Sequence, residues 1–411
     1  MSPAGSVRPA RGVWRALARL AISVTVAAGA AALIAHRSVA TAGERQTSDP
    51  VDAIVAGMSL DDKVGQLFML GFASSDVGAA LPLLTELRVG GIVLTDNVSD
   101  AISARALTSA LQNQAAGNDL LPLLIAVNHE GGNVQPINGG MTVFPPQWNL
   151  GEIQPTKAAV AAACDRGDVM GRELAAIGIS MNLAPDLDVW DNPANTVIAR
   201  RSFSSDPTTV AELGSAYIEA LQNHGVLAVG KHFPGHGSST EDSHAALPKI
   251  RHDRAWLDAH ELVPFQAAIQ ANVAAIMVGH LSFPLIDPDP NRPSSLSSVF
   301  ITDILRTELG YGGLVVTDDL GAMKAVTAGY TPGSAAVLAL QAGVDVLLSV
   351  GPLASEREMV AAVKAAVGSS ISPARVDASV RRVLQAKMQA GLLRGEAPPL
   401  TPDSPVCTPA S

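Results

Sequence analysis

Residues 226–244 read VLAVGKHFPGHGSSTEDSH. The apolar run Val226–Val229 at the start has the composition of a β-strand that is buried on both faces. A cation, three imidazoles and two carboxylates follow this run, and proline and glycine residues interrupt them. Because proline and closely spaced glycines exclude a helix interior, we interpret residues 231–244 as a polar loop. A polar loop at the end of a buried strand is where α/β barrels carry their active sites.

Seven more β-rich runs have the length and composition of strands. The eight predicted strands are Gly65–Gly71, Gly91–Thr95, Leu121–Val127, Gly178–Leu183, Val226–Val229, Ala274–Val278, Gly313–Thr317 and Asp345–Val350. Amphipathic stretches typical of helices lie between them. One begins at Ser59, and the others are Ala101–Ala115, Ala158–Ala176, Pro207–His224, Arg254–Ala271, Ser298–Leu309, Gly333–Ala342 and Ser355–Val367, with a last helical element at Ser370–Leu393.

Eight strand–helix repeats predict a single-domain α/β fold, the (β/α)8 TIM-type barrel. An open, doubly wound sheet is the alternative, because periodicity alone does not show that the strands close into a ring.

The N-terminal segment has the pattern of an export signal. Four arginines precede an apolar run at residues 20–35, and Ala40-Thr41-Ala42 has the small-x-small form of a cleavage site. This run is shorter than a typical membrane span of roughly 20 residues. We therefore predict a protein that works outside the cytoplasm, either secreted or associated with the cell envelope. The predicted organisation is a signal peptide or membrane anchor at 1–42, a connector at 43–50, the barrel at 51–393 and a proline-rich tail at 394–411.

Composition and charge restrict the classes of partner. Hydrophobic residues make up 47% of the chain, which is enough for a large core. The net charge is −10, and the first 42 residues contain five arginines and no acid, so the rest of the chain carries −15. This acidic body argues against a nucleic-acid partner.

The two cysteines, Cys164 and Cys407, could form a disulfide in an exported protein. Cys164 lies in a helical pattern and Cys407 lies in the predicted tail, so the sequence leaves their pairing open.

Five successive predicted strands end in polar or ionisable residues. In chain order these ends carry Asn128-His129-Glu130, Asn182 with Asp188 beyond it, Lys231-His232, His280, and Asp318-Asp319. Each residue alone has a structural interpretation, since an aspartate can cap the next helix or hold loop amides and a lone histidine can belong to the core. Because the active residues of barrels gather where the strands end, the shared position favours one active site.

Metal binding also has to be considered, because the loop contains the possible ligands His232, His236, Asp242 and His244. A His-x-x-x-His pair binds zinc when both rings lie on one face of a helix. Pro234 and Gly235 lie between the first two histidines, so no such face exists. We therefore expect neither a metal site nor a cofactor.

The segment Lys231–Gly237, followed by Asp242-Ser243-His244, resembles the signature of family 3 glycoside hydrolases, in their bacterial single-domain β-N-acetylglucosaminidase branch. The likeness covers residues 52–393. Further matches to the family are Gly131-Gly132 after Glu130, Leu183-Ala184-Pro185 leading to Asp188, Arg201-Ser202-Phe203 with Asp206-Pro207, Val278-Gly279-His280, and Thr317-Asp318-Asp319-Leu320.

This resemblance implies a retaining glycosidase mechanism. Asp318 matches the family nucleophile, which forms a covalent glycosyl-enzyme. His244 matches the acid/base of this branch, and Asp242 is its partner. A histidine has an unperturbed pKa near working pH, and a neighbouring carboxylate can orient its ring and favour the imidazolium. The glycine-rich loop is expected to swing this pair over the sugar, and we interpret Asp319 as structural.

The resemblance also implies how the sugar is held. Lys231, His232 and Arg201 match the residues that recognise the N-acetylglucosamine ring, and Asp188 is expected to support them. The implied substrate is peptidoglycan-derived material with terminal β-1,4-linked N-acetylglucosamine. We expect a monomer with no nucleic-acid partner, which meets a membrane only through the possible N-terminal anchor.

Two positions depart from the family pattern. The family has an aspartate where this chain has Asn128, and an arginine where it has Pro136. Asn128 can donate and accept, but it loses charge-assisted hydrogen bonds worth roughly 1.5–3 kcal/mol each. Two alternatives therefore stay open: a β-glucosidase or glycoside phosphorylase on the same scaffold, and a muropeptide-binding protein without catalysis.

Overall fold

The computed structural model describes residues 50–95, 97–393 and 407. The described residues from Val51 onward belong to one compact unit. The predicted signal or anchor, almost all of the connector and most of the predicted tail lie outside the described residues. Among the residues that are described, no helix is long and apolar enough to cross a membrane.

Eight parallel strands form the centre of the unit, in the order β7-β6-β5-β4-β3-β2-β1-β8. Their bounds are β1 Phe68–Gly71, β2 Gly91–Leu94, β3 Leu124–Val127, β4 Met181–Asn182, β5 Leu227–Phe233, β6 Ala275–Val278, β7 Leu314–Thr317 and β8 Leu347–Ser349. A parallel bridge between Val316 and Val346 joins the two ends of the sheet, and the amide of Thr317 donates to Val346 O at 3.0 Å. The strands therefore close into the predicted (β/α)8 barrel, and the open-sheet alternative is wrong.

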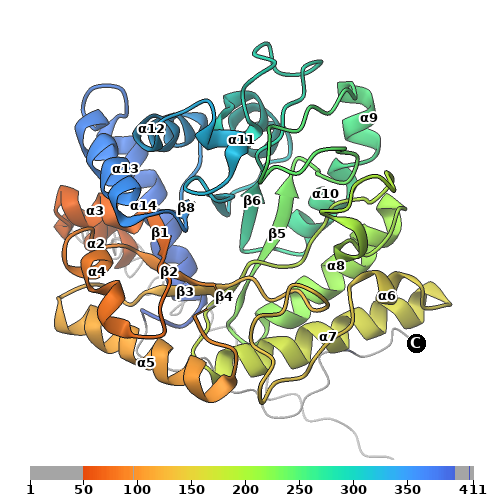
Figure 1. The fold of residues 1–411 in the computed structure, drawn as a ribbon, viewed down its shortest axis with the longest axis horizontal. Helices are drawn as coiled ribbons and strands as arrows, with labels where there is room; N and C mark the ends of the chain where they lie inside the picture. The colour runs from red at the N-terminus through yellow and green to blue at the C-terminus, as the bar shows by residue number, and fades with distance from the viewer. Residues whose placement is uncertain (1–49, 96, 394–406, 408–411) are drawn as a thin grey trace, which may run out of the picture. The chain divides into compact units, whose positions relative to one another are not determined.

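Helices surround the strands (Figure 1). The α-helices are α2 Pro50–Gly57, α3 Leu60–Gln66, α4 Leu81–Thr85, α5 Ala101–Gly117, α6 Trp148–Gly151, α7 Thr156–Ala176, α8 Pro207–Gln222, α9 Arg254–Ala259, α10 Leu262–Gln270, α11 Lys324–Thr327, α12 Pro332–Ala342, α13 Leu353–Ala366 and α14 Pro373–Gln389. Three short 3-10 helices, η1 Val77–Ala80, η2 Ala199–Arg201 and η3 Ser294–Leu296, and the π-helix η4 Val299–Glu308 complete the set.

Side-chain caps fix where several of these helices begin. Asp206 accepts from the amide of Thr209 at 2.9 Å, and Pro207 occupies the first helical position of α8. Thr331 caps α12 in the same way, with Pro332 next to it. These short-range signals explain why the predicted helix starts agree closely with the observed ones.

Helix α14 covers the end of the barrel where the strands begin. Arg382 donates to Asp345, just before β8, at 3.0 Å, and the Nζ of Lys387 donates to Gln66, just before β1, at 2.6 Å. The apolar residues Val383 and Ala386 of α14 pack with the inward-facing residues of the strands. Because this end is filled, the opposite end, where the strands finish, is the one left for a site.

Several bounds of the predicted elements are wrong, and the strand predicted at Gly178–Leu183 is only Met181–Asn182. The predicted strand Gly65–Gly71 begins only at Phe68, since Gly65 and Gln66 belong to α3. The predicted helix Arg254–Ala271 is two helices, because Pro264 cannot donate to the carbonyl four residues earlier and the chain leaves helical geometry at His260.

Two further differences concern η4 and β5. The predicted helix Ser298–Leu309 is a π-helix over Val299–Glu308. Strand β5 continues to Phe233, so Lys231 and His232 are strand residues and the loop begins at Pro234.

Cys164, in α7, forms a disulfide with Cys407, and their Cα atoms lie 5.8 Å apart. The two cysteines therefore pair, a point that the sequence left open. Cys407 is the described residue of the predicted tail, and the bond attaches it to the barrel.

Candidate active site

The ends of the strands surround a cavity of about 510 Å³. Six of the eight predicted site residues line it, namely Asn128, Arg201, Lys231, His232, His244 and Asp318. Asp242 lines a neighbouring cavity of about 600 Å³, which His244 and Arg201 also line. Asp188 lies behind His232, so the structure places it as a support for the cavity wall.

Asp318 follows β7 directly. Its amide donates to Val278 O of β6 at 2.9 Å, and its Oδ1 accepts from the amide of Asp319 at 2.8 Å. Burial alone would raise the pKa of Asp318, but the neighbouring His232 and His280 outweigh burial and hold that pKa below its ordinary value. The side chain is therefore a carboxylate held in one position, facing the cavity.

The next residue, Asp319, serves the backbone around the site. Its Oδ1 accepts from the amides of Gly321 at 2.8 Å and Val350 at 3.0 Å, which ties the β7 and β8 ends together. His280 is fully buried behind it and bonds Asp319 O through Nε2 at 3.0 Å and Ser295 Oγ through Nδ1 at 2.7 Å. Asp319, which also lines the cavity, and His280, which lies behind it, therefore fix the backbone around the site.

Asp242 and His244 form a hydrogen-bonded pair on the loop after β5. Asp242 Oδ1 lies 2.8 Å from His244 Nδ1 and 2.9 Å from the His244 amide. The pair is exposed, with 67% of the His244 side chain and 45% of the Asp242 side chain accessible to solvent. Although burial opposes it, hydrogen bonding to His244 lowers the pKa of Asp242. This geometry leaves His244 Nε2 available for a ligand in the cavity.

The first part of this loop is fixed by the segment after β4. The amide of His236 donates to Asp188 Oδ1 at 2.6 Å, and Asn195 Nδ2 donates to the carbonyls of His236 at 2.8 Å and Gly237 at 3.0 Å. Asn192 Nδ2 donates to the carbonyls of Ser238 and Ser239. Gly237 allows the close backbone contact here, since a Cβ on this residue would lie 1.8 Å from Val189 O. The exposed part of the loop lies at residues 240–246, with the exception of Ser243.

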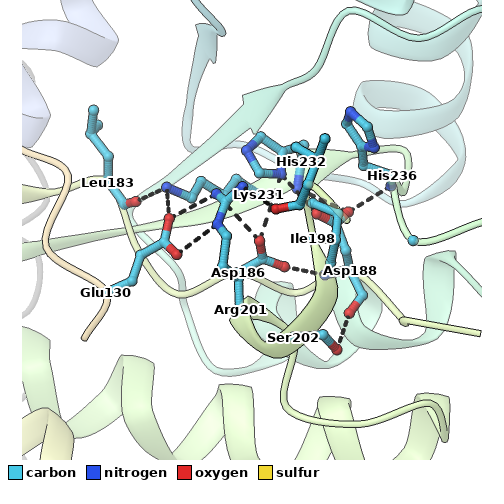
Figure 2. Close-up of polar contacts among 12 residues, drawn as sticks. Glu130, Leu183, Asp186, Asp188, Ile198, Arg201, Ser202, Lys231, His232 and His236 are labelled. Carbon is cyan, nitrogen blue, oxygen red and sulfur yellow. Dashed lines mark hydrogen bonds and ion pairs between the residues drawn. The ribbon is translucent and has the colours of Figure 1, made fainter. Parts of the chain in front are cut away.

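Lys231 and Glu130 are buried together under the cavity (Figure 2). The Nζ of Lys231 lies 2.5 Å from Glu130 Oε1 and 2.6 Å from Asn128 Oδ1, and it also donates to Leu183 O. An ammonium group has three protons. All three donors of Lys231 therefore have protein partners.

Arg201 reaches the same carboxylate from η2. Its guanidinium donates to both oxygens of Glu130, at 2.9 and 2.8 Å, and lies 3.5 Å from Asp186 Oδ2. Burial would raise the pKa of Glu130, but the positive charges of Arg201 and Lys231 lower it to about 2. Glu130 thus binds Lys231 and Arg201, the two cations that the family resemblance assigns to the sugar.

The predicted site did not include Glu130 or Asp186. Glu130 stands at the end of the third predicted strand, as the predicted site residue Asn128 does. This position is the signal in the sequence that could have identified it. Asp186 has the structural role that an aspartate in a loop often has, since its Oδ1 accepts from the amide of Asp188 at 3.0 Å. It also lies beside Arg201, a contact that spacing along the chain does not reveal.

His232 faces the cavity and is oriented from behind by Asp188. The Nδ1 of His232 lies 2.7 Å from Asp188 Oδ2, and its amide donates to Asp188 Oδ1 at 3.2 Å. His232 lowers the pKa of Asp188 to about 2, against the effect of burial. Burial and the charge of Asp188 raise the pKa of Asp186 well above its ordinary value.

Within the described part of the chain, one set of side chains has the spacing of metal ligands. Asp186, Asp188 and His232 present ligand atoms within 4.8 Å of one another. Arg201 lies next to this set, and Nδ1 of His232 already donates its proton to Asp188. The positive charge of the guanidinium opposes a cation there. This set shares only His232 with the ligands considered from the sequence.

Sequence and fold comparisons were consistent with this geometry. The family model described as "Glycosyl hydrolase family 3 N terminal domain" matches residues 59–386. The Beta-hexosaminidase A of Pseudoalteromonas piscicida is 36% identical over 339 residues, 74% of this chain and 55% of that protein. The Beta-hexosaminidase of Idiomarina loihiensis is 38% identical over 267 residues, 65% of this chain and 78% of that protein.

Among solved structures, a glycoside hydrolase family 3 beta-N-acetylglucosaminidase from Paenibacillus sp. str. FPU-7 has a TM-score of 0.78 and 42% sequence identity. The match covers 82% of this chain and 64% of that one. The chain therefore spans about half the length of the Pseudoalteromonas relative and less than two thirds of the Paenibacillus chain.

Proposed function

The chain belongs to glycosyl hydrolase family 3, and we propose that it is a retaining β-N-acetylhexosaminidase that removes terminal β-linked N-acetylglucosamine. One observation carries this proposal. Asp318 and His244 line the same cavity although 74 residues separate them in the chain, and Asp242 is bonded to His244. A carboxylate nucleophile and an oriented acid/base are the two parts that a retaining mechanism requires.

In the first step, Asp318 attacks the anomeric carbon and forms a glycosyl ester. The bond from that carbon to the leaving oxygen breaks, and His244 gives the leaving oxygen a proton from Nε2. Asp242 stabilises the imidazolium before this transfer and keeps the ring oriented through Nδ1. In the second step, neutral His244 takes a proton from water, which attacks the same carbon and releases Asp318.

The substrate assignment rests on the relatives and on the donors around the cavity. Arg201, His232 and Asn128 line the cavity beside Asp318 and offer hydrogen-bond donors to sugar hydroxyls and to an N-acetyl carbonyl. Lys231 acts through Asn128 and Glu130, since its protons are engaged by the protein. Asp188 holds His232 in position.

We assign peptidoglycan fragments as the natural material and a location outside the cytoplasm. The support for location is the sequence of residues 1–42, with its arginines, apolar run and small-x-small site. Arg201 lines both cavities, and its partly exposed guanidinium suits a neighbouring carboxylated sugar.

Hydrolysis of chromogenic β-N-acetylglucosaminide tests this function. The β-glucoside and β-N-acetylgalactosaminide serve as competing substrates, and Asp318→Ala is the inactive control. We expect release from the N-acetylglucosaminide by the parent only, with products that do not change when phosphate is added. A parent that is as inert as Asp318→Ala, on this substrate and on muropeptides, would contradict the proposal. Binding of muropeptides in calorimetry without turnover would then indicate a binding protein.

A further inference from the structure

His236 is a buried histidine that the proposed chemistry does not use. Only 2% of it is exposed, and it lies next to His232 with ring centroids 5.8 Å apart. Both ring nitrogens have partners from its own loop. Nδ1 lies 2.8 Å from Ser239 Oγ, and Nε2 lies 3.3 Å from Ser243 Oγ. Figure 2 shows the backbone amide of the same residue bonded to Asp188.

Ser243 stands between the two residues of the catalytic pair. Asp242 and His244 are exposed, whereas Ser243 is only 2% exposed and points to His236. Its carbonyl accepts from the amide of Ala325 at 3.1 Å, and the carbonyl of His244 accepts from the amide of Lys324 at 3.3 Å. The exposed pair is therefore attached at two places, to His236 on one side and to the start of α11 on the other.

The hydrogen bonds around Ser239 indicate the direction of each bond. Ser239 Oγ accepts from Asn195 Nδ2 at 3.3 Å and donates to Glu241 O at 3.3 Å. Nδ1 of His236 then donates to Ser239 Oγ, and the lone pair of Nε2 accepts the hydroxyl proton of Ser243. Burial lowers the pKa of His236 to about 4, which keeps the ring in the neutral form that this arrangement needs.

We propose that His236 is a positioning residue, which sets the place of the Asp242–His244 pair over the cavity through its hydrogen bond to Ser243. The inference rests on the proposed function, because it assigns a role relative to the acid/base. Asp188 connects the two halves of the site, since one carboxylate orients both His232 in the cavity wall and the backbone of His236.

Two variants distinguish the hydrogen bond made by Nε2 of His236 from the one made by Nδ1. In His236→Gln the side-chain amide reaches the place of Nε2 and can still meet Ser243. In His236→Asn the amide reaches only the place of Nδ1 and meets Ser239. His236→Leu removes both contacts, and Ser243→Ala removes the proposed contact with a smaller change in volume. Thr240→Ala, an exposed position in the same loop, is the matched control.

The measurement is kcat/KM on two N-acetylglucosaminides, one with an activated aryl leaving group and one with an alkyl or sugar leaving group. The aryl group leaves without a proton, whereas the alkyl or sugar group needs one from His244. We expect His236→Leu, His236→Asn and Ser243→Ala to lose about 10- to 100-fold on the second substrate and far less on the first. His236→Gln and Thr240→Ala should stay close to the parent.

A second measurement tests the step in which the sugar is released from Asp318. Azide needs no general base, so it should restore kcat on the aryl substrate in the variants that displace the pair. Equal losses on both substrates, together with a lower melting temperature, would show that His236 only supports the fold, and losses in His236→Gln as large as those in His236→Leu would also overturn the proposal. If His244→Ala itself shows no dependence on the leaving group, the acid/base assignment fails first, and the proposal about His236 fails with it.

Discussion

Asn128 meets Lys231 through its side-chain oxygen, and the chemistry of the ammonium group fixes this orientation. An ammonium group donates hydrogen bonds and cannot accept them. The oxygen of Asn128 therefore faces Nζ, at 2.6 Å, and its NH2 group is the part left for the cavity. An aspartate in this place would offer the cavity an acceptor with a negative charge, so this single residue changes what the end of the cavity can bind.

We expect Asn128→Asp to raise kcat/KM on N-acetylglucosaminides by about 10-fold or more, mainly through a lower KM. The physical reason is that a carboxylate can accept charge-assisted hydrogen bonds from sugar hydroxyls, each worth about 1.5–3 kcal/mol. Steady-state kinetics check this. Asn223→Asp, an exposed position at the end of α8, controls for the added charge. An unchanged or lower kcat/KM would show that Asn128 already fits the natural substrate.

Glu130 neutralises the buried cation Lys231 and also binds the partly exposed Arg201. We therefore expect Glu130→Gln to lower the free energy of unfolding at neutral pH by about 3–5 kcal/mol. The pKa of Glu130 is lowered from 4.5 to about 2. The carboxylate thus contributes stability that is fully present above about pH 4.5 and is lost as pH falls towards 2.

Urea unfolding of the parent and Glu130→Gln at several pH values tests this sign. The difference between the two proteins should be largest above pH 4.5 and should shrink between pH 4.5 and 2. Glu219→Gln, exposed on α8, is the matched control. A difference that is constant over this range would mean that Glu130 is not the group that titrates.

The strands and the loop after β5 show where reasoning from the sequence succeeds. Apolar runs identified all eight strands, and the predicted start of α8 at Pro207 agrees with the structure, because these signals are local. The extent of β5 was not predictable in the same way. Lys231 and His232 look like loop residues because they are polar, and they remain in the strand because Glu130 and Asp188, from other strand ends, bond them.

The fixed base of this loop can be tested at Gly237. A Cβ on this residue would lie 1.8 Å from Val189 O, a backbone atom that cannot move without its neighbours. We expect Gly237→Ala to destabilise the protein by about 1–3 kcal/mol or more and to lower kcat/KM. Gly312→Ala is the control, because a Cβ there meets nothing within 4 Å. Equal stability of the two variants in urea would show that the loop base is free to move.

For the molecule as a whole, the number of repeats predicted the barrel, and the contact between β7 and β8 was needed to show its closure. The composition of the site likewise depends on contacts that only the fold shows. The sequence selected polar strand ends, and closure of the ring explains why residues as distant as Asn128 and Asp318 line one cavity. Glu130 was missed because its role depends on two cations that only the fold brings to it.

The disulfide links positions 243 residues apart and is far along the chain from the catalytic residues. We expect its reduction to lower the free energy of unfolding by about 2–4 kcal/mol, because an unfolded chain without the crosslink gains conformational entropy. Thermal unfolding with and without reductant measures this, and kcat should stay the same. The variant Cys164→Ser should match the reduced parent and should not respond to reductant. A parent whose melting temperature ignores reductant would show that the crosslink contributes nothing.

The proposed mechanism requires that Asp318 forms the covalent bond to the sugar and that His244 acts as the acid/base. His244→Ala should still react with an activated aryl N-acetylglucosaminide, since that leaving group needs no proton, and should then release the sugar slowly because the general base is missing. Intact-mass and peptide mass spectrometry of this variant during turnover should therefore find one N-acetylglucosaminyl group on the peptide that contains Asp318. Turnover with no adduct, or an adduct on a different residue, would contradict the assignment.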